Sequence, residues 1–152
     1  MAQLLPQLFD ETHDAFRATC RSFAEAEIAP NAEAWEEAGV FPRELYVAAA
    51  EAGVLAPTFP EELGGGGGDV LHGVVAGEEL QRGGSTGTVV GLTGSLSIAL
   101  PPILSLGTPA QIDHFVPPVL AGRHIAALGI TEPDTGSDVA AVRTRARRDG
   151  EH

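Results

Sequence analysis

Apolar residues recur every three or four positions along most of this chain, a spacing that places them on one face of a helix. From Asp10 to Ala29 they alternate with charged residues, which predicts an amphipathic helix that ends or bends at Pro30. The side chains expected to face the core are Phe9, Phe16, Cys20, Phe23 and Ala24.

Start and stop residues predict further helices of the same kind. Residues 31–37 continue helically until Gly39, and Pro42 suits the first turn of a second helix that Gly53 closes. A glycine-rich loop follows, and Asp69 can cap a third helix after it. The residues that mark this third helix are Val70, Val74, Val75, Glu78 and Leu80.

An uncharged segment extends from Gly83 to Gln111, and its stretch up to Leu106 is almost wholly apolar. A helix that is apolar on every side is expected at the centre of a bundle. Because proline removes a backbone donor, Pro101-Pro102 should kink or split this helix.

One more helix is predicted by Thr108 as N-cap and Pro109 as the first helical residue. It ends near Gly122. Its inward side chains are expected to be Ile112, Phe115, Val116 and Val119.

The apolar period changes after this helix. Ile125–Thr131 is a short, mostly apolar run and Val142–Arg147 alternates strictly, both typical of strands. The predicted fold class is therefore mainly α. An N-terminal helical bundle, residues 1–123, is followed by the first strands of a truncated β domain, residues 124–152.

Charge and composition limit the classes of partner that this chain is expected to bind. The net charge of −12, with no lysine, argues against nucleic acid or an anionic membrane, since both attract a positive surface. No stretch is expected to approach the roughly 20 apolar residues that cross a bilayer. The single cysteine, Cys20, excludes an internal disulfide, and no basic segment resembling a signal peptide begins the chain. A cytoplasmic location is the expectation.

Neither the histidines nor the glycine run predicts a site by spacing. The five histidines lack metal-ligand spacing, so no metal is expected and each is assigned to the surface or a helix end. They are His13, His72, His114, His124 and His152. The run Gly64–Gly68 lacks the lysine of a phosphate-binding loop, which leaves a flexible connection as its interpretation.

The segment 128–138 carries the most suggestive chemistry, because a strand with small side chains on one face lets a planar ring approach its backbone. The small face is formed by Ala127, Gly129 and Thr131, and the face toward a core by Leu128 and Ile130. Gly136 permits a positive φ in the turn, and amides near Ser137 could hold phosphate oxygens. An ordinary capped turn explains the same spacing, so the residues alone leave both interpretations open.

The string Thr131-Glu132-Pro133-x-x-Gly136-Ser137-Asp138 resembles the flavin-binding signature of the acyl-CoA dehydrogenases in residue type and spacing. Other segments resemble that family in the same order. They are the loop Phe59-Pro60-Glu61-Glu62-Leu63-Gly64-Gly65, the helical Glu78-Glu79-Leu80, and the helix that begins at Gly107-Thr108. The resemblance covers nearly the whole chain.

The resemblance implies an N-terminal helical domain, a middle β domain and a C-terminal helical bundle, with FAD between the last two. It carries cofactor contacts onto five residues of this chain. These are Leu128, Ile130, Thr131, Gly136 and Ser137. Ser137 would also contact the acyl-CoA substrate.

The implied reaction is α,β-dehydrogenation of an acyl-CoA thioester, in which a carboxylate removes the α-proton and the flavin accepts a hydride. An electron-transfer protein would reoxidise the flavin, and subunits would assemble as homo-oligomers, usually tetramers. The family's catalytic glutamate lies in the C-terminal bundle, which has no counterpart in these 152 residues. No catalytic residue is therefore assigned, and the chain is expected to be an N-terminal portion that is inactive alone.

Two alternatives stay open. An acyl-CoA oxidase or related flavin monooxygenase would share the fold and differ in how reduced flavin meets oxygen. A non-catalytic helical interaction module could retain the ancestral motif.

Overall fold

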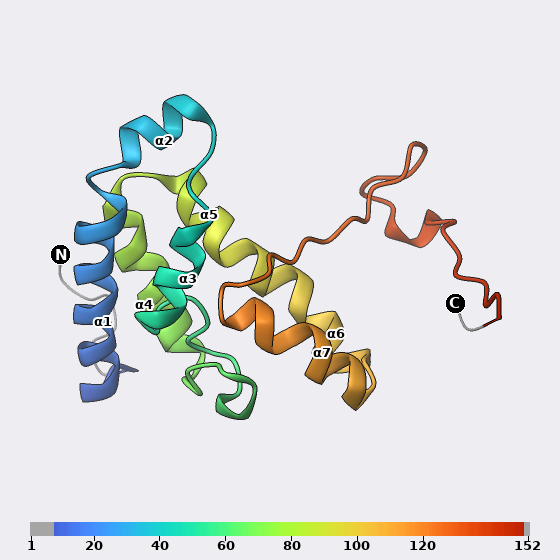
Figure 1. Cartoon of the computed structure of the whole chain (residues 1–152), viewed down its shortest axis with the longest axis horizontal. Coiled ribbons are helices and arrows are strands. Elements are labelled where there is room, and N and C mark those ends of the chain that lie inside the picture. Colours follow the sequence, from blue (N-terminus) through green and yellow to red (C-terminus); the bar gives the residue numbers. More distant parts are fainter. Residues whose placement is uncertain (1–7, 151–152) are drawn as a thin grey trace.

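The computed structural model describes residues 8–150, in which helices pack side by side and a long tail leaves them (Figure 1). The α-helices are α1 (Glu11–Phe23), α2 (Ala32–Ala38), α3 (Glu44–Glu51), α4 (Val70–Leu80), α5 (Thr86–Gly94), α6 (Leu100–Leu106) and α7 (Pro109–Leu120). Wider π turns extend α1 through Ala24–Ile28 and join α5 to α6 through Ser95–Ala99. Single 3₁₀ turns lie at Glu61–Leu63, Gln81–Gly83 and Val139–Ala141.

The predicted caps at Asp69 and Thr108 are confirmed, and Asp10, which was not predicted as a cap, serves as one for α1. Asp10 and Asp69 accept hydrogen bonds from the first-turn amides of α1 and α4, and Thr108 accepts one in α7. These bonds satisfy backbone donors that a helix start leaves without a partner. The chain turns at Gly39 and Gly53, where φ is +66° and +73° and a side chain would be strained.

The core is built almost entirely from aliphatic side chains, because aromatic residues make up only 5% of the chain. Its largest fully buried apolar residues are Ile28, Val54, Val75, Leu80, Leu92, Leu100, Val116 and Leu120. The expected inward face of α7 is wrong at Phe115, which is 49% exposed. The buried face of α4 is Val75, Ala76, Glu79 and Leu80, whereas Val70 and Val74 are exposed.

The apolar segment forms one unbroken helix, Thr86–Leu106, and the two prolines do not split it. Both prolines lie in the first turn of α6, directly after the π turn. The wider backbone of the π turn therefore comes just before the two positions at which proline has no N–H to donate. The expectation that this helix lies at the centre of the bundle is wrong, because only 28% of its most apolar stretch is buried. Ile98 and Leu106 are 56% and 85% exposed.

This helix also corrects the expectation that no apolar stretch could span a bilayer. Among the described residues, Thr86–Leu106 has the length and composition to do so, with 21 residues. The same length and composition occur in core helices of folded domains. Its buried side packs under α3, where the Tyr46 hydroxyl donates to the Gly91 carbonyl at 2.9 Å.

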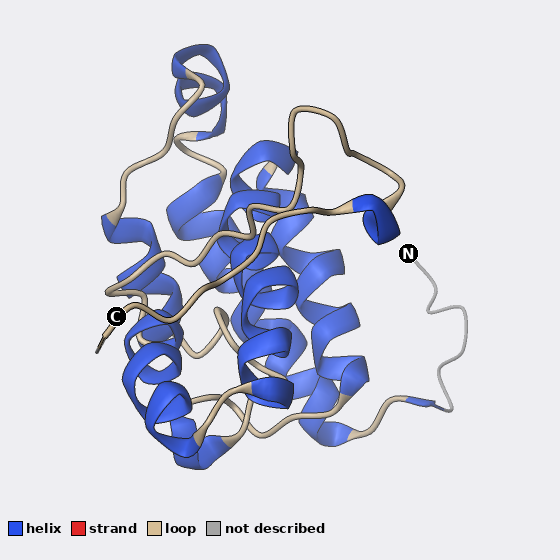
Figure 2. Cartoon of the chain, turned by 90° about the vertical axis from the view of Figure 1, so that its right-hand side faces the viewer, coloured by secondary structure: helices blue, strands red, loops and turns tan. Residues whose placement is uncertain are grey.

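Neither predicted strand forms within residues 8–150, and Figure 2 shows helices and loops alone. Ile125–Thr131 and Val142–Arg147 are extended without ladder partners, so the predicted β part is not observed. A strand is defined by hydrogen bonds to a neighbour. The only such contact in the described tail is a single bridge between Glu132 and Thr135.

A buried ion cluster joins α1 to α4, which run parallel. The Glu79 side chain is 1% exposed and accepts from Arg17 Nη1 at 2.8 Å and Arg21 Nε at 2.8 Å. Arg82 Nε adds a third contact at 2.9 Å. Hydrogen bonds from Arg21 and then Arg17 hold the pKa of Glu79 below its ordinary value of 4.5, although burial opposes them.

We expect Glu79→Gln to lower the free energy of unfolding by roughly 3 kcal/mol at pH 7, because it removes the buried charge that pairs with three guanidinium groups, of which that of Arg17 is only 14% exposed. A carboxylate whose pKa is lowered by folding stabilises above its unfolded pKa and loses that contribution as pH falls through the folded pKa. Urea unfolding at pH 7 and pH 3 should therefore show a smaller acid loss in the variant than in the wild type.

The matched control is Glu78→Gln, since Glu78 is 49% exposed and bonds only Arg17. It should change stability by less than about 1 kcal/mol. Equal losses in the two variants would contradict the role given to burial.

The bundle ends at Gly122, whose backbone lies against α3. Its φ is +69°, and an added Cβ would lie 2.3 Å from the Tyr46 carbonyl oxygen. Gly122→Ala should cost roughly 3 kcal/mol or more, from the strained φ and the clash together. Gly53→Ala is the control, because Gly53 shares the positive φ after a helix but has open space around it. Denaturant midpoints that agree for both variants would disprove the clash.

Candidate functional site

The five residues predicted to contact a cofactor all lie on the tail that extends away from the helices (Figure 1, orange to red). Leu128 and Ile130 are 46% and 44% exposed, which corrects the expectation that they face a core. Thr131, Gly136 and Ser137 are exposed as well. The described residues place the five on one loop but do not enclose them in a pocket.

The hydrogen-bonded turn in this loop is formed by Glu132–Thr135 and does not include Gly136. Glu132 and Thr135 exchange backbone hydrogen bonds of 2.9 Å and 3.2 Å around Pro133-Asp134. Thr135 is buried, and its hydroxyl donates to the Ala141 carbonyl at 3.3 Å. Gly136 does not adopt the positive φ expected of it.

The Glu132 carboxylate closes the loop by bonding the chain that returns past it. It accepts the amides of Arg143 at 2.9 Å and Thr144 at 2.6 Å, and the Thr144 hydroxyl as well. Thr144 and then Arg143 lower the pKa of Glu132, because their hydrogen bonds favour the charged form. Sequence reasoning gave Glu132 no role, and only the folded loop reveals it.

A cleft of about 500 Å³ lies between α2, the start of α3 and the start of α5. Apolar rings of Trp35 and Phe41 form its wall, and Ile125 lies at its edge. The Ser85 hydroxyl donates to Glu36 at 2.6 Å beside it. The cleft was not predicted, and its lining residue Ile125 lies six positions before the string 131–138 that resembles a flavin-binding signature.

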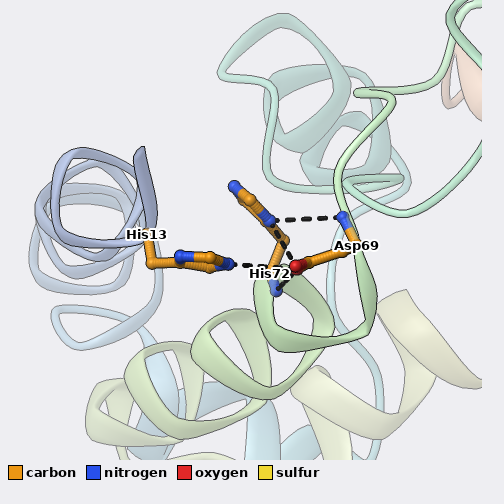
Figure 3. Close-up of side chains that lie close together, drawn as sticks. All are labelled: His13, Asp69 and His72. Atoms are coloured by element: carbon orange, nitrogen blue, oxygen red, sulfur yellow. Dashed lines mark hydrogen bonds and ion pairs between the residues drawn. The ribbon is translucent and has the colours of Figure 1, made fainter. Parts of the chain in front are cut away.

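His13, Asp69 and His72 come together where α1 and α4 begin (Figure 3). His13 Nε2 and His72 Nδ1 lie 3.1 Å and 2.9 Å from the same Asp69 oxygen. The hydrogen bond to Asp69 raises the pKa of His13 above its ordinary 6.5. Of the two positions expected for the histidines, surface or helix end, His13 takes the second, because it lies in the first turn of α1 and is only 4% exposed.

The acyl-CoA dehydrogenase N-terminal domain family matches residues 10–123 of this chain. The long-chain specific mitochondrial acyl-CoA dehydrogenase of Rattus norvegicus is 40% identical over 144 residues, which are 95% of this chain and 33% of that protein. The chain therefore spans about a third of the length of the curated relatives it matches.

Solved structures of the same family share the fold. An acyl-CoA dehydrogenase from Geobacillus kaustophilus aligns with a TM-score of 0.84 at 37% identity, covering 93% of this chain and 37% of that one. A glutaryl-CoA dehydrogenase from Mycobacterium smegmatis, solved in complex with FADH2, aligns at 0.80 and 32% identity over 95% and 37%. Coverage this high includes most of the tail as well as the helices.

Replacing Glu132 with glutamine should loosen the loop, because a neutral amide is a weaker acceptor than a carboxylate. We expect faster hydrogen exchange at the Arg143 and Thr144 amides, measured by NMR at neutral pH. The amides of α7 should be unaffected. Unchanged exchange at both loop positions would show that the carboxylate does not hold the returning chain.

Proposed function

The chain belongs to the acyl-CoA dehydrogenase family, and we propose that it supplies the N-terminal helical domain and one wall of the flavin site in an FAD-dependent acyl-CoA dehydrogenase. The family's members are oxidoreductases. The observation that carries the proposal is similarity over 95% of the chain, together with the signature at 131–138. The structure of a relative in complex with FADH2 supports the choice of cofactor.

The exposed loop suits a flat cofactor. Within the described residues, the backbone of 128–131 makes no hydrogen bond to other backbone groups, so its N–H and C=O groups can bond the heteroatoms of a ring. Added Cβ atoms at Gly129 and Gly136 would meet nothing within 4 Å, which leaves both faces open to close approach. FAD bound there would supply the hydride acceptor for the reaction.

Each residue of the loop then has a positioning role. Leu128 and Ile130 provide apolar contact and backbone groups, and Thr131 adds a hydroxyl that can donate and accept. Gly136 and Ser137 follow the tight turn, where the Ser137 hydroxyl can contact FAD and the acyl-CoA. Closure of the loop by Glu132 holds these groups in fixed relation to one another.

The α-proton of the thioester is removed, in this proposal, by the family's C-terminal carboxylate and not by a residue of this chain. Glu132 is the carboxylate of the loop with its oxygens already bonded, and its lowered pKa makes it a weak base. The 152 residues alone are accordingly proposed to be inactive.

The proposed assembly is a homo-oligomer, tetrameric as in the family, that passes electrons to an electron-transfer protein. The net charge of −12 favours soluble partners over nucleic acid. We propose a cytoplasmic location, with which a single buried, unoxidised cysteine is compatible.

A chimera tests the proposal. The corresponding third of the Geobacillus kaustophilus enzyme is replaced by this chain, and flavin content and acyl-CoA-dependent dye reduction are measured. We expect a flavin-containing, active chimera. Thr131→Val should weaken FAD binding roughly five- to tenfold through one lost hydrogen bond, and Ser137→Ala should raise the KM for acyl-CoA.

Ser22→Ala, on the exposed side of α1, is the matched control and should leave both measurements unchanged. The 152-residue chain alone should reduce no dye. A folded chimera without flavin, full activity in both loop variants, or turnover by the chain alone would each contradict the corresponding part of the proposal.

A further inference from the structure

Two neighbouring helices begin with the same four-residue arrangement. Asp10 and Asp69 cap α1 and α4, and the histidine three residues later in each accepts the capping residue's own N–H. The two arrangements meet, because His13 reaches across to Asp69 (Figure 3). One atom each from His13, Asp69 and His72 lies within 4.8 Å of the other two.

We propose that His13 Nε2, Asp69 Oδ1 and His72 Nδ1 form a binding site for a divalent transition-metal ion, with Zn²⁺ as the best match. A set of two imidazole nitrogens and one carboxylate oxygen binds Zn²⁺ in preference to Mg²⁺ or Ca²⁺. Three protein ligands leave the fourth position of a tetrahedral ion to water.

The geometry around His13 is that of a supported metal ligand. With an ion on Nε2, His13 would carry its proton on Nδ1, where Asp10 Oδ1 at 2.8 Å can accept it in place of the bond that Nδ1 otherwise accepts from the Asp10 N–H. His72 Nδ1 would likewise release the Asp69 N–H to bind the ion. The His13 ring is held between the edge-on ring of Phe9 at 5.7 Å and the ring of His72 at 4.3 Å. Little side-chain entropy remains to be lost when His13 binds an ion.

The ion can reach this site and is attracted to it. The Asp69 and His72 side chains are 56% and 18% exposed, so solvent borders the side opposite His13. Two helix N-termini bring the equivalent of about half a positive charge each, while Asp10 and Asp69 bring a full negative charge each. The sum is about −1 before Glu11 and Asp14 of the first turn of α1 are added.

Capping alone is the competing explanation, and it predicts a different response to substitution. Glutamine at the third helical position also completes a capping box, and asparagine is as good an N-cap as aspartate. His72→Gln and Asp69→Asn therefore preserve both caps while removing a ligand or its charge. Any metal response that these variants lose cannot come from capping.

The experiment titrates the chelator-stripped 152-residue chain with ZnCl2 by calorimetry at pH 8, where imidazole is largely neutral. We expect one Zn²⁺ per chain and a Tm that rises with Zn²⁺ concentration. Affinity should fall at least tenfold in both His72→Gln and Asp69→Asn. His114→Gln and His124→Gln, which remove exposed histidines elsewhere, should bind as the wild type does.

Cobalt substitution gives an independent measurement. Co²⁺ held tetrahedrally by nitrogen and oxygen ligands should produce visible absorption bands that His13→Gln and His72→Gln abolish. Absence of stoichiometric Zn²⁺ binding overturns the proposal. Binding that survives His72→Gln and Asp69→Asn also overturns it, and in either case the cluster is only a pair of joined helix caps.

Discussion

The parallel pairing of α1 with α4 is the constraint on which the rest of this structure depends. Its centre is the buried Glu79 carboxylate of α4, held by Arg17 and Arg21 of α1 and by Arg82 on the turn after α4. A buried charge is tolerated only when paired and hydrogen-bonded, so these contacts fix how far one helix can slide along the other. That register in turn brings the two helix starts together and places His13 beside Asp69.

The loop that resembles a flavin-binding signature depends on the bundle through one junction. Gly122 lets the chain leave α7 against the backbone of Tyr46, and the tail then extends beyond the core. The loop closes on itself through Glu132 and presents its backbone outward. A ligand held between two domains needs free hydrogen-bonding groups on each of them. In the described residues, the backbone N–H and C=O groups of 128–131 are free in this way.

Sequence reasoning succeeded where the cause is local and failed where it is not. The caps at Asp69 and Thr108 were predictable because the donor and acceptor lie within three residues of each other. The burial of Glu79 was not predictable, because its neighbour Glu78 is the same type of residue. Only the facing arginines of α1 distinguish the two. Phe115 and the helix Thr86–Leu106 were assigned to the interior because hydrophobicity does not tell which side of a helix the rest of the molecule covers.

The sequence by itself determined the helices, their ends and the family, because hydrogen bonds along one helix and motif spacing are written in consecutive residues. Tertiary structure decided the rest. The strands predicted after Gly122 do not form in the described tail, since a strand needs a partner that its own sequence does not supply. The cluster of His13, Asp69 and His72 joins residues 56 positions apart, and only the packing of α1 on α4 brings them within reach.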